Sequence, residues 1–502
     1  MKNIRLVFML LIIGLSFSAC EDFLDVNSNP NAPVSENLKL SAKLSAALVS
    51  SVNQENIQLN QIGAFWAGYW GTTSEGVNLF PDLKSYNGPA IRHQRDGIPV
   101  WENGYTTLLY YQLIKEQAIA EDASFYAGIA KIMQAWHFMR LVDIYNNLPF
   151  DEALQGTVFP TPTYEEGKTV YQKSIDLISE GMADIKVAKA VGSTPTTDDV
   201  MFKGNAPLWL KFGNTLKLRA LLRQSETQNT AYLNSEMQKI TAEGSGFLGV
   251  NQHASIQPGY LLTAGKMNPL WENYYRNVQG VSTTNHIDIR PTQYLIDQYV
   301  SRNDPRLEQL YAAVGGQYKG VLFGNPNAET IYNRASTSAF KGPQENANKA
   351  GGIFKSATQA SILLGSFESL FLQAEAAQRG WLIAPAKTLY DQAISESFLY
   401  LGVAPAAVAP YLAQENVAFN QSLEQIITQK WLALNSISSI EAWNDYRRLG
   451  IPAIPNSLDA PAPDVRPLRF MYPESERQTN NTEASRQGSD DILSAKVWWD
   501  VN

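Results

Sequence analysis

The 502-residue sequence contains a single cysteine, Cys20. One thiol cannot form a disulfide within the chain, so the fold must depend on the burial of apolar side chains. A chain of this length with 44% hydrophobic residues can bury a large core without cross-links. The cysteine count therefore excludes a small disulfide-stapled module and favours a large globular architecture.

Positive charge is also scarce. The chain has 40 Lys and Arg against 48 Asp and Glu, which gives a formal net charge of -8, and no basic run occurs. Proteins that bind nucleic acids or other polyanions need a positive face to displace counterions. The charge balance therefore excludes nucleic acid as a partner.

Sequence motifs for catalysis are missing as well. The four histidines are scattered, and the sequence has neither an H-E-x-x-H segment nor Cys/His zinc spacing nor a G-x-S-x-G elbow. Residues 244–249 match G-x-G-x-x-G, but they follow a predicted helix, where glycines that end the helix explain them better. We therefore predict no metal site, no cofactor and no enzymatic activity.

No apolar run reaches the ~20 residues that a transmembrane helix needs. The N-terminus instead has the order of a secretory signal: Lys2 and Arg5, an apolar run over residues 6–13, and then small residues before Cys20. We predict a signal peptide over residues 1–19. A permanent transmembrane anchor is the poorer interpretation.

Cys20 stands where a bacterial lipoprotein signal places the cysteine that takes up diacylglycerol, although Phe17 occupies a position where leucine is more usual. The alternative is a buried free cysteine, but a lone thiol in an exported protein would be a reactive liability. We therefore predict that Cys20 is lipidated. The polar, proline-containing stretch that follows has too little apolar surface to fold alone, so residues 20–37 are expected to be a flexible tether.

Beyond the tether, apolar residues recur at three- and four-residue spacing, which is typical of amphipathic helices. The predicted helices span 38–60, 100–121, 124–142, 168–188, 206–224, 366–380, 384–398, 422–434 and 439–448. Asn205 followed by Pro207 predicts a capped helix start, because proline is tolerated in the first turn. Residues 366–398 form two short helices with small residues where they would cross, the unit of a tetratricopeptide-like repeat. Because no clean 34-residue period exists, we predict a mainly α fold of degenerate helical hairpins.

Residues 244–352 have a different pattern, rich in glycine, proline, asparagine and aromatics, and are predicted to form an irregular lobe of loops, short strands and short helices. A sugar site needs flat aromatic rings beside groups that can form paired hydrogen bonds. Two stretches supply this mixture, at 65–86 and 268–276. The candidate ligand-binding residues are Trp66, Trp70, Trp271, Tyr274, Tyr275 and Arg276. The four-residue spacing of Trp66 and Trp70 also fits a buried helical face, which is the stronger interpretation for that pair.

Short segments distributed over nearly the whole chain resemble the SusD/RagB family of outer-membrane lipoproteins from Bacteroidetes. They include CEDFLD at 20–25, LVDIY at 141–145, LPF at 148–150, WLKF at 209–212, DPR at 304–306, QKW at 429–431, EAW at 441–443 and YRR at 446–448. No single segment is decisive, but their order and spacing together are specific. Most lie on predicted helices, so we expect Trp209, Lys217, Arg219, Trp431, Trp443 and Arg447 to belong to the scaffold and not to contact a ligand.

The resemblance implies a right-handed helical scaffold, formed by one domain over residues 38–502, that sits as a lid on a SusC-like TonB-dependent transporter. It also implies a protein that captures an oligosaccharide at the cell surface while anchored to the outer membrane through its lipid. A peptide- or glycopeptide-binding member of the family is an alternative. A lipid-anchored scaffold without a small ligand is another. These expectations rest on analogy and not on periodicity.

Overall fold

The computed structural model describes residues 38–188 and 194–501. The predicted signal peptide over residues 1–19 and the predicted tether over residues 20–37, with Cys20, lie outside the described residues. The described chain is mainly helical, as predicted.

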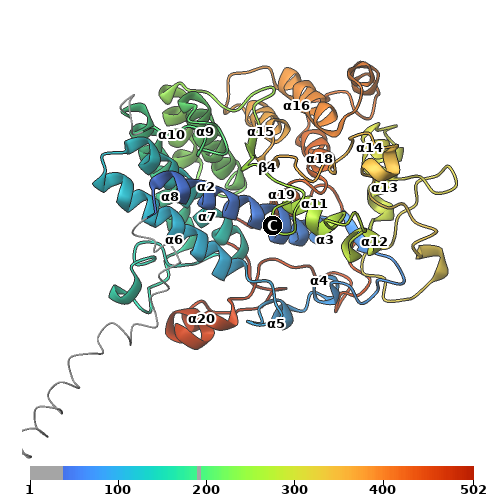
Figure 1. Ribbon diagram of the computed structural model, residues 1–502, viewed down its shortest axis with the longest axis horizontal. Coiled ribbons are helices and arrows are strands. Elements are labelled where there is room, and N and C mark those ends of the chain that lie inside the picture. Colours follow the sequence, from blue (N-terminus) through green and yellow to red (C-terminus); the bar gives the residue numbers. More distant parts are fainter. Residues whose placement is uncertain (1–37, 189–193, 502) are drawn as a thin grey trace, which may run out of the picture.

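Antiparallel helical hairpins form most of the molecule (Figure 1). The N-terminal set comprises α6 (Val100–Ala120), α7 (Ser124–Tyr145), α8 (Gly167–Lys186), α9 (Ala206–Arg223) and α10 (Thr230–Glu243). The C-terminal set comprises α15 (Ser366–Gln378), α16 (Ala386–Leu401), α17 (Val408–Leu412), α18 (Leu423–Leu434) and α19 (Ser439–Leu449). The expected cap is present, because the side chain of Asn205 accepts a hydrogen bond from the Leu208 amide at 3.1 Å. The helical-hairpin prediction is therefore confirmed.

Close helix packing in the first set depends on a pair of glycines. A Cβ on Gly128 would lie 2.5 Å from the carbonyl oxygen of Gly181, and a Cβ on Gly181 would lie 2.6 Å from that of Gly128. Only residues without a side chain allow the backbones of α7 and α8 to approach this closely. The crossing is thus built on the small residues that tetratricopeptide-like hairpins require.

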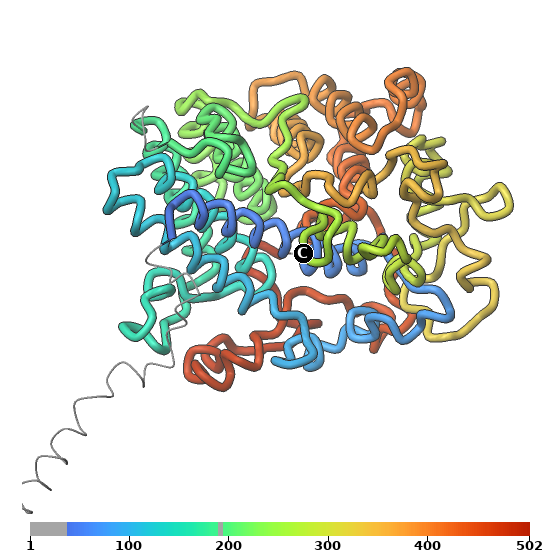
Figure 2. The backbone as a smooth tube through the Cα atoms, viewed as in Figure 1, coloured from blue at the N-terminus to red at the C-terminus, as the bar shows by residue number. Residues whose placement is uncertain are grey.

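One long helix crosses the molecule from the hairpins to the lobe (Figure 2). It consists of α2 (Leu40–Asn53), a π-helical segment η2 (Gln54–Leu59) and α3 (Asn60–Trp66). Sequence periodicity predicted a helix ending at residue 60, and the structure extends it by six residues. At its far end, α3 packs closely on α19, because a Cβ on Gly63 would lie only 2.2 Å from the Ile440 nitrogen. This helix therefore joins the N- and C-terminal hairpins.

The segment between the two hairpin sets is irregular, as predicted. Its short elements are β2 (Ala254–Ile256), α11 (Pro269–Tyr274), α12 (Thr284–Asp288), β3 (Ile289–Pro291), α13 (Gln293–Val300), α14 (Arg306–Leu310), η4 (Thr330–Tyr332) and η5 (Pro343–Asn346). Strand β1 (Trp70–Thr72) pairs antiparallel with β3, and β4 (Ser361–Leu364) pairs antiparallel with β2. These two-stranded ladders tie the lobe to the scaffold.

The remaining short elements cover the edges of the scaffold. They are α4 (Pro81–Ser85), α5 (Gly88–Ile91), η3 (Gly156–Val158), η6 (Pro405–Ala407), α20 (Glu474–Thr479) and α21 (Asn481–Arg486). Among the residues that the structure describes, no helix combines the length and apolarity needed to cross a membrane.

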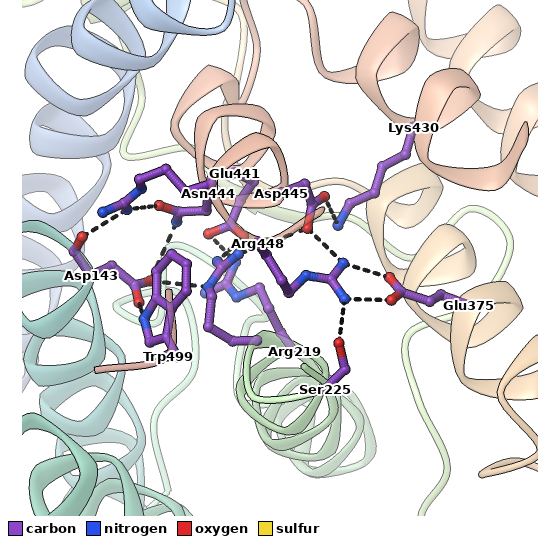
Figure 3. A network of polar contacts seen from close by, with 12 residues as sticks. Asp143, Arg219, Ser225, Glu375, Lys430, Glu441, Asn444, Asp445, Arg448 and Trp499 are labelled. Carbon is purple, nitrogen blue, oxygen red and sulfur yellow. Dashed lines mark hydrogen bonds and ion pairs between the residues drawn. The ribbon is translucent and has the colours of Figure 1, made fainter. Parts of the chain in front are cut away.

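A network of buried charges fastens α19 to its neighbours (Figure 3). Arg448 donates to both carboxylate oxygens of Glu375 at 2.5 and 2.9 Å, and Lys430 lies 2.7 Å from Asp445. Burial by itself would raise the pKa of Asp445, but the adjacent Lys430 and Arg448 lower it below its ordinary value. The residues predicted to be scaffold are all buried, which confirms that prediction: Trp209, Lys217, Arg219, Trp431, Trp443 and Arg447.

Candidate functional site

Trp66 and Trp70, two of the six predicted ligand residues, lie in the hydrophobic core. Trp66 is 3% exposed, and its Nε1 donates to the Leu83 carbonyl at 2.9 Å. Trp70 is fully buried, and its Nε1 donates to Ser436 Oγ at 2.7 Å. Both rings pack against other aromatic rings and present no face to solvent, so both belong to the core. They do not share a helical face, because Trp66 ends α3 whereas Trp70 begins strand β1.

The other four predicted residues lie on or just after α11. Tyr274 and Tyr275 are buried, whereas Trp271 and Arg276 are partly exposed. Glu345 connects the last two positions, because it accepts from the Tyr275 hydroxyl at 2.7 Å and from the Arg276 guanidinium at 2.9 Å. This part of the predicted site is thus packed against the lobe, with Trp271 and Arg276 at its edge.

A groove runs along the long crossing helix, bordered in one part by the segment 258–273 and in the other part by α6. It consists of two cavities, of about 340 and 310 Å³, that share Asn53 and Ile57. We call it the α2 groove. The first cavity is lined by Val49, Asn53, Ile57, Pro258, Gly259, Tyr260, Leu261, Gly265, Lys266, Met267, Pro269, Glu272 and Asn273, and the second by Ser50, Asn53, Gln54, Ile57, Gln58, Asn103, Thr106 and Tyr110.

The π-helical segment η2 forms the shared wall of the two cavities. Its exposed side supplies Gln54, Ile57 and Gln58 to the groove, while Glu55 and Asn56 point inward. Glu55 lies 3.0 Å from Arg140, and Asn56 donates to the Ile362 carbonyl at 2.8 Å. A π-helical turn inserts one extra residue and is frequently found at functional sites. In this protein, one side of η2 is held by the buried contacts of Glu55 and Asn56, and the other side faces the groove.

Carboxamides and hydroxyls dominate the second cavity. Asn103, Thr106 and Tyr110 recur on one face of α6, and Tyr110 is 41% exposed. Asn103 donates to Gln58 Oε1 at 3.1 Å, and Gln54 donates to Thr107 at 3.0 Å. Each carboxamide carries both donors and an acceptor, so these side chains keep hydrogen-bonding capacity for a ligand.

Apolar side chains characterise the first cavity. Val49 and Ile57 face it from the crossing helix, and Tyr260, Leu261 and Met267 face it from the loop that precedes α11. Leu261 is 55% exposed, so the apolar lining of this cavity reaches the surface. The α2 groove therefore combines an apolar half with a polar, uncharged half.

Sequence reasoning pointed to a segment that borders the α2 groove, but the residues it singled out do not line the groove. Residues 268–276 do border the groove, but through Pro269, Glu272 and Asn273 and not through the aromatic rings. Sequence reasoning did not single out Asn53, Gln58 and Asn103, because isolated polar residues on helices are normally solvated surface residues. The polar run at 50–58, which interrupts an otherwise apolar helical pattern, was the only available signal.

A separate open recess of about 550 Å³ lies near the C-terminal end of the described chain, beside Lys168, Glu226 and Trp498. It is lined by the first turn of α8, the connection between α9 and α10, and the C-terminal segment, and no residue of the irregular lobe lines it. In residues 38–188 and 194–501, no group of three His, Cys, Asp or Glu side chains is placed to hold a metal ion.

The fold and groove define a helical-hairpin binding protein. The family model described as "Starch-binding associating with outer membrane" matches residues 30–473, which is most of the chain. The chain therefore belongs to the SusD-like family, whose members are non-catalytic binding proteins, and it is a nutrient-binding protein associated with the outer membrane. A search of curated proteins gave no match.

Solved structures of SusD homologues share this fold. One from Bacteroides fragilis has a TM-score of 0.75 at 21% identity, with 92% of this chain and 100% of that chain covered. One from Bacteroides uniformis has a TM-score of 0.73 at 21% sequence identity, with 93% of this chain and 100% of that chain covered. A chitin-binding homologue from Flavobacterium johnsoniae has a TM-score of 0.73 at 22% sequence identity, with 91% of this chain and 99% of that chain covered.

Proposed function

We propose that this protein captures an oligosaccharide at the cell surface in the α2 groove and delivers it to a SusC-like TonB-dependent transporter. The observation that carries the proposal is the pairing of an apolar half-groove with a half-groove of carboxamides and hydroxyls. Sugar rings offer apolar C–H faces and hydroxyls that both donate and accept, so they match both halves. Delivery to the transporter rests on family membership.

Trp271 and Arg276 are proposed as additional ligand contacts at the edge of the groove. Trp271 directly precedes Glu272 and Asn273, which line the groove, and its side chain is partly exposed. Tyr274 supports the groove wall from within the core, because its hydroxyl donates to the Ile57 carbonyl at 3.2 Å, whereas Trp66, Trp70 and Tyr275 are buried core residues.

The groove can be tested with a double variant, Asn53→Ala with Gln58→Ala. Each lost hydrogen bond contributes about 0.5–1.5 kcal/mol, so we expect the dissociation constant for a bound oligosaccharide to rise about tenfold. Isothermal titration calorimetry against a glycan panel measures this. Gln238→Ala, an exposed position on α10, is the matched control and is expected to leave affinity unchanged.

Three results would contradict the proposal. Equal affinity of the double variant and wild type would remove the groove from the site. Binding to peptides with silence on the glycan panel would favour a peptide-binding family member, and silence on both would favour a scaffold without a small ligand. Release of shortened sugars from any bound oligosaccharide would contradict the non-catalytic assignment.

We further propose the domain organisation that places the groove at the surface: a signal peptide over 1–19, a lipidated tether over 20–37 and one domain over 38–502. The thioether on Cys20 is the only predicted attachment. We therefore expect Cys20→Ala to move the protein from the membrane fraction to the soluble fraction when it is expressed in a lipoprotein-processing bacterium. Cys20→Ser, which also lacks the thiol, should behave in the same way, and retention of either variant at the membrane would overturn the lipid anchor.

A further inference from the structure

The α2 groove carries almost no charge. Of the residues that line its two cavities, only Lys266 and Glu272 are ionisable at neutral pH, and both belong to the first cavity. The second cavity contains no Asp, Glu, Lys, Arg or His side chain. One charge of each sign leaves the lining formally neutral, although the chain as a whole has 88 charged residues. The second cavity is thus lined by uncharged side chains alone.

Of the two charged residues of the groove, Lys266 belongs to the loop that precedes α11 and Glu272 to the first turn of α11. Glu272 Oε1 accepts a hydrogen bond from the Gly265 amide at 2.7 Å, and the Lys266 carbonyl accepts one from Leu261 at 2.8 Å. Gly259 and Gly265, which bracket this loop, have φ of +91° and +71°, values that L side chains rarely adopt. Glu272 therefore holds the Leu261 loop in place, and its carboxylate is already engaged.

A charged sugar chain would require more than this groove supplies. An acidic chain carries a carboxylate or sulfate on each repeating unit, and each needs a cation or several donors to replace its water shell. Lys266 offers one cation at one end, and the carboxamides around Gln58 offer no charge. A polyamine sugar would meet one carboxylate, Glu272, that already accepts a backbone bond.

An uncharged chain has no such requirement. Asn53, Gln54, Gln58, Asn103 and Asn273 place carboxamides along both cavities, and Ser50 and Thr106 add hydroxyls. Carboxamides and hydroxyls exchange hydrogen bonds with neutral hydroxyl or amide groups without leaving an uncompensated charge. Because Asn53 and Ile57 border both cavities, a chain of several sugars can lie continuously across η2.

We propose that the α2 groove selects an uncharged oligosaccharide chain, laid across the π-helical segment, and rejects acidic and cationic chains. This inference rests on the proposed function, since it names the class of sugar that the same groove takes. It goes beyond that function because capture alone would be served equally well by a charged site.

The test uses hexasaccharides with the mature protein. The neutral set is chitohexaose, cellohexaose, xylohexaose and laminarihexaose. The charged set is hexa-glucosamine, which is chitohexaose without its acetyl groups, and hexa-galacturonate. We expect the best neutral binder to have a dissociation constant at least ten times lower than either charged chain at moderate salt, because only the charged chains lose solvation that the groove cannot replace.

A variant that introduces a charge tests whether the preference for neutral chains arises in the α2 groove. Gln58→Lys places a cation in the uncharged half, so we expect it to weaken the best neutral binder about tenfold and to improve hexa-galacturonate binding. Gln238→Lys on α10 adds the same charge at an exposed site away from the groove and is expected to change neither.

Tighter binding of a charged chain than of every neutral one, lost in Gln58→Lys or the Asn53/Gln58 double variant, would overturn the inference while keeping the proposed oligosaccharide capture. Silence towards every chain would overturn the proposed capture itself. Neutral binding that Gln58→Lys leaves unchanged would overturn the assignment to the α2 groove.

Discussion

Glu441→Ala is expected to lower the free energy of unfolding by about 3–5 kcal/mol, because removing one partner from a buried ion pair leaves uncompensated buried charge. The Glu441 side chain is fully buried and accepts hydrogen bonds from Arg140 and Arg223, with Arg219 3.6 Å away. Burial already lowers the pKa of Arg219 to about 10. Loss of the carboxylate would therefore leave three buried guanidinium groups with one anionic partner fewer. Each still contacts another carboxylate: Glu55 for Arg140, Glu368 for Arg219 and Asp143 for Arg223. Urea unfolding at neutral pH measures the loss.

The matched control is the exposed pair formed by Lys387 and Asp391, whose side chains are 65% and 25% exposed. Surface pairs of this kind contribute little, so Asp391→Ala should change the free energy of unfolding by less than about 1 kcal/mol. Glu441→Gln keeps a hydrogen-bond acceptor without the charge, so its loss in free energy of unfolding should lie between the losses of Glu441→Ala and Asp391→Ala. A loss in Glu441→Ala no larger than that of the control would show that the network is not a source of stability.

The same network reaches the groove. Arg140 contacts Glu441 on one side and Glu55, at 3.0 Å, on the other, and Glu55 belongs to η2. Removing Glu441 would therefore disturb the anchor of the π-helical wall as well as the core. A Glu441→Ala protein that remains folded should consequently bind its ligand more weakly than wild type, although Glu441 does not line the groove.

The helices could be predicted because their determinants are local. Asn205 and Pro207 mark the start of α9 by cap and first-turn chemistry, and apolar spacing outlines α7 and α8. The irregular lobe was visible for the same reason, since glycine and proline change the local pattern. Elements that depend on their own sequence were thus recovered to within a few residues.

The groove could not be predicted, because its walls come from distant segments. Residues 49–58, 103–110 and 258–273 meet only after folding, and nothing in Asn53 or Gln58 alone distinguishes a groove wall from a solvated helix face. The partners of buried charges are equally remote: Arg140 and Glu441 are 301 positions apart. The aromatic stretch at 65–70 offered both a ligand and a core interpretation, and only its packing against Trp443 and Tyr274 distinguishes them.

The second large effect is expected at acidic pH, where His137→Gln should make stability less dependent on pH. Burial, reinforced by the positive charge of Arg140, lowers the pKa of His137 from 6.5 to about 3. Its Nε2 lies 2.8 Å from Ser51 Oγ, and the Trp136 ring packs against the imidazole with 4.7 Å between ring centroids. The native state therefore keeps this imidazole neutral in a range where the unfolded chain protonates it.

The direction of the change in stability with pH follows from the difference in proton binding between the folded and unfolded states. Below pH 6.5 the unfolded state binds a proton at His137 that the folded state does not, so stability decreases as pH falls, by up to about 1.4 kcal/mol per pH unit. The full contribution is present above pH 6.5 and is lost progressively as pH falls towards 3. Between pH 7.5 and 5 the loss from this residue amounts to about 2 kcal/mol.

Other buried groups titrate in the same range, so the substitution is needed to isolate His137. Burial also lowers the pKa of His253 and His286, which adds to the loss at acidic pH, whereas burial raises the pKa of Glu55, which opposes it. These contributions are common to wild type and variant and cancel in the difference. Urea unfolding at a series of pH values should give a His137→Gln profile that is flatter than wild type by about 2 kcal/mol between pH 7.5 and 5.

His93→Gln is the control, because it makes the same substitution at a ring that is 49% exposed. Glutamine at position 137 can still form a hydrogen bond with Ser51 but cannot acquire a proton. The variant therefore distinguishes the effect of protonation at residue 137 from the effect of its packing. If the profiles of wild type and His137→Gln run parallel while the variant is uniformly less stable, residue 137 contributes through packing alone. If they converge towards acidic pH, the neutral imidazole beside Arg140 is what makes this helical scaffold sensitive to acid.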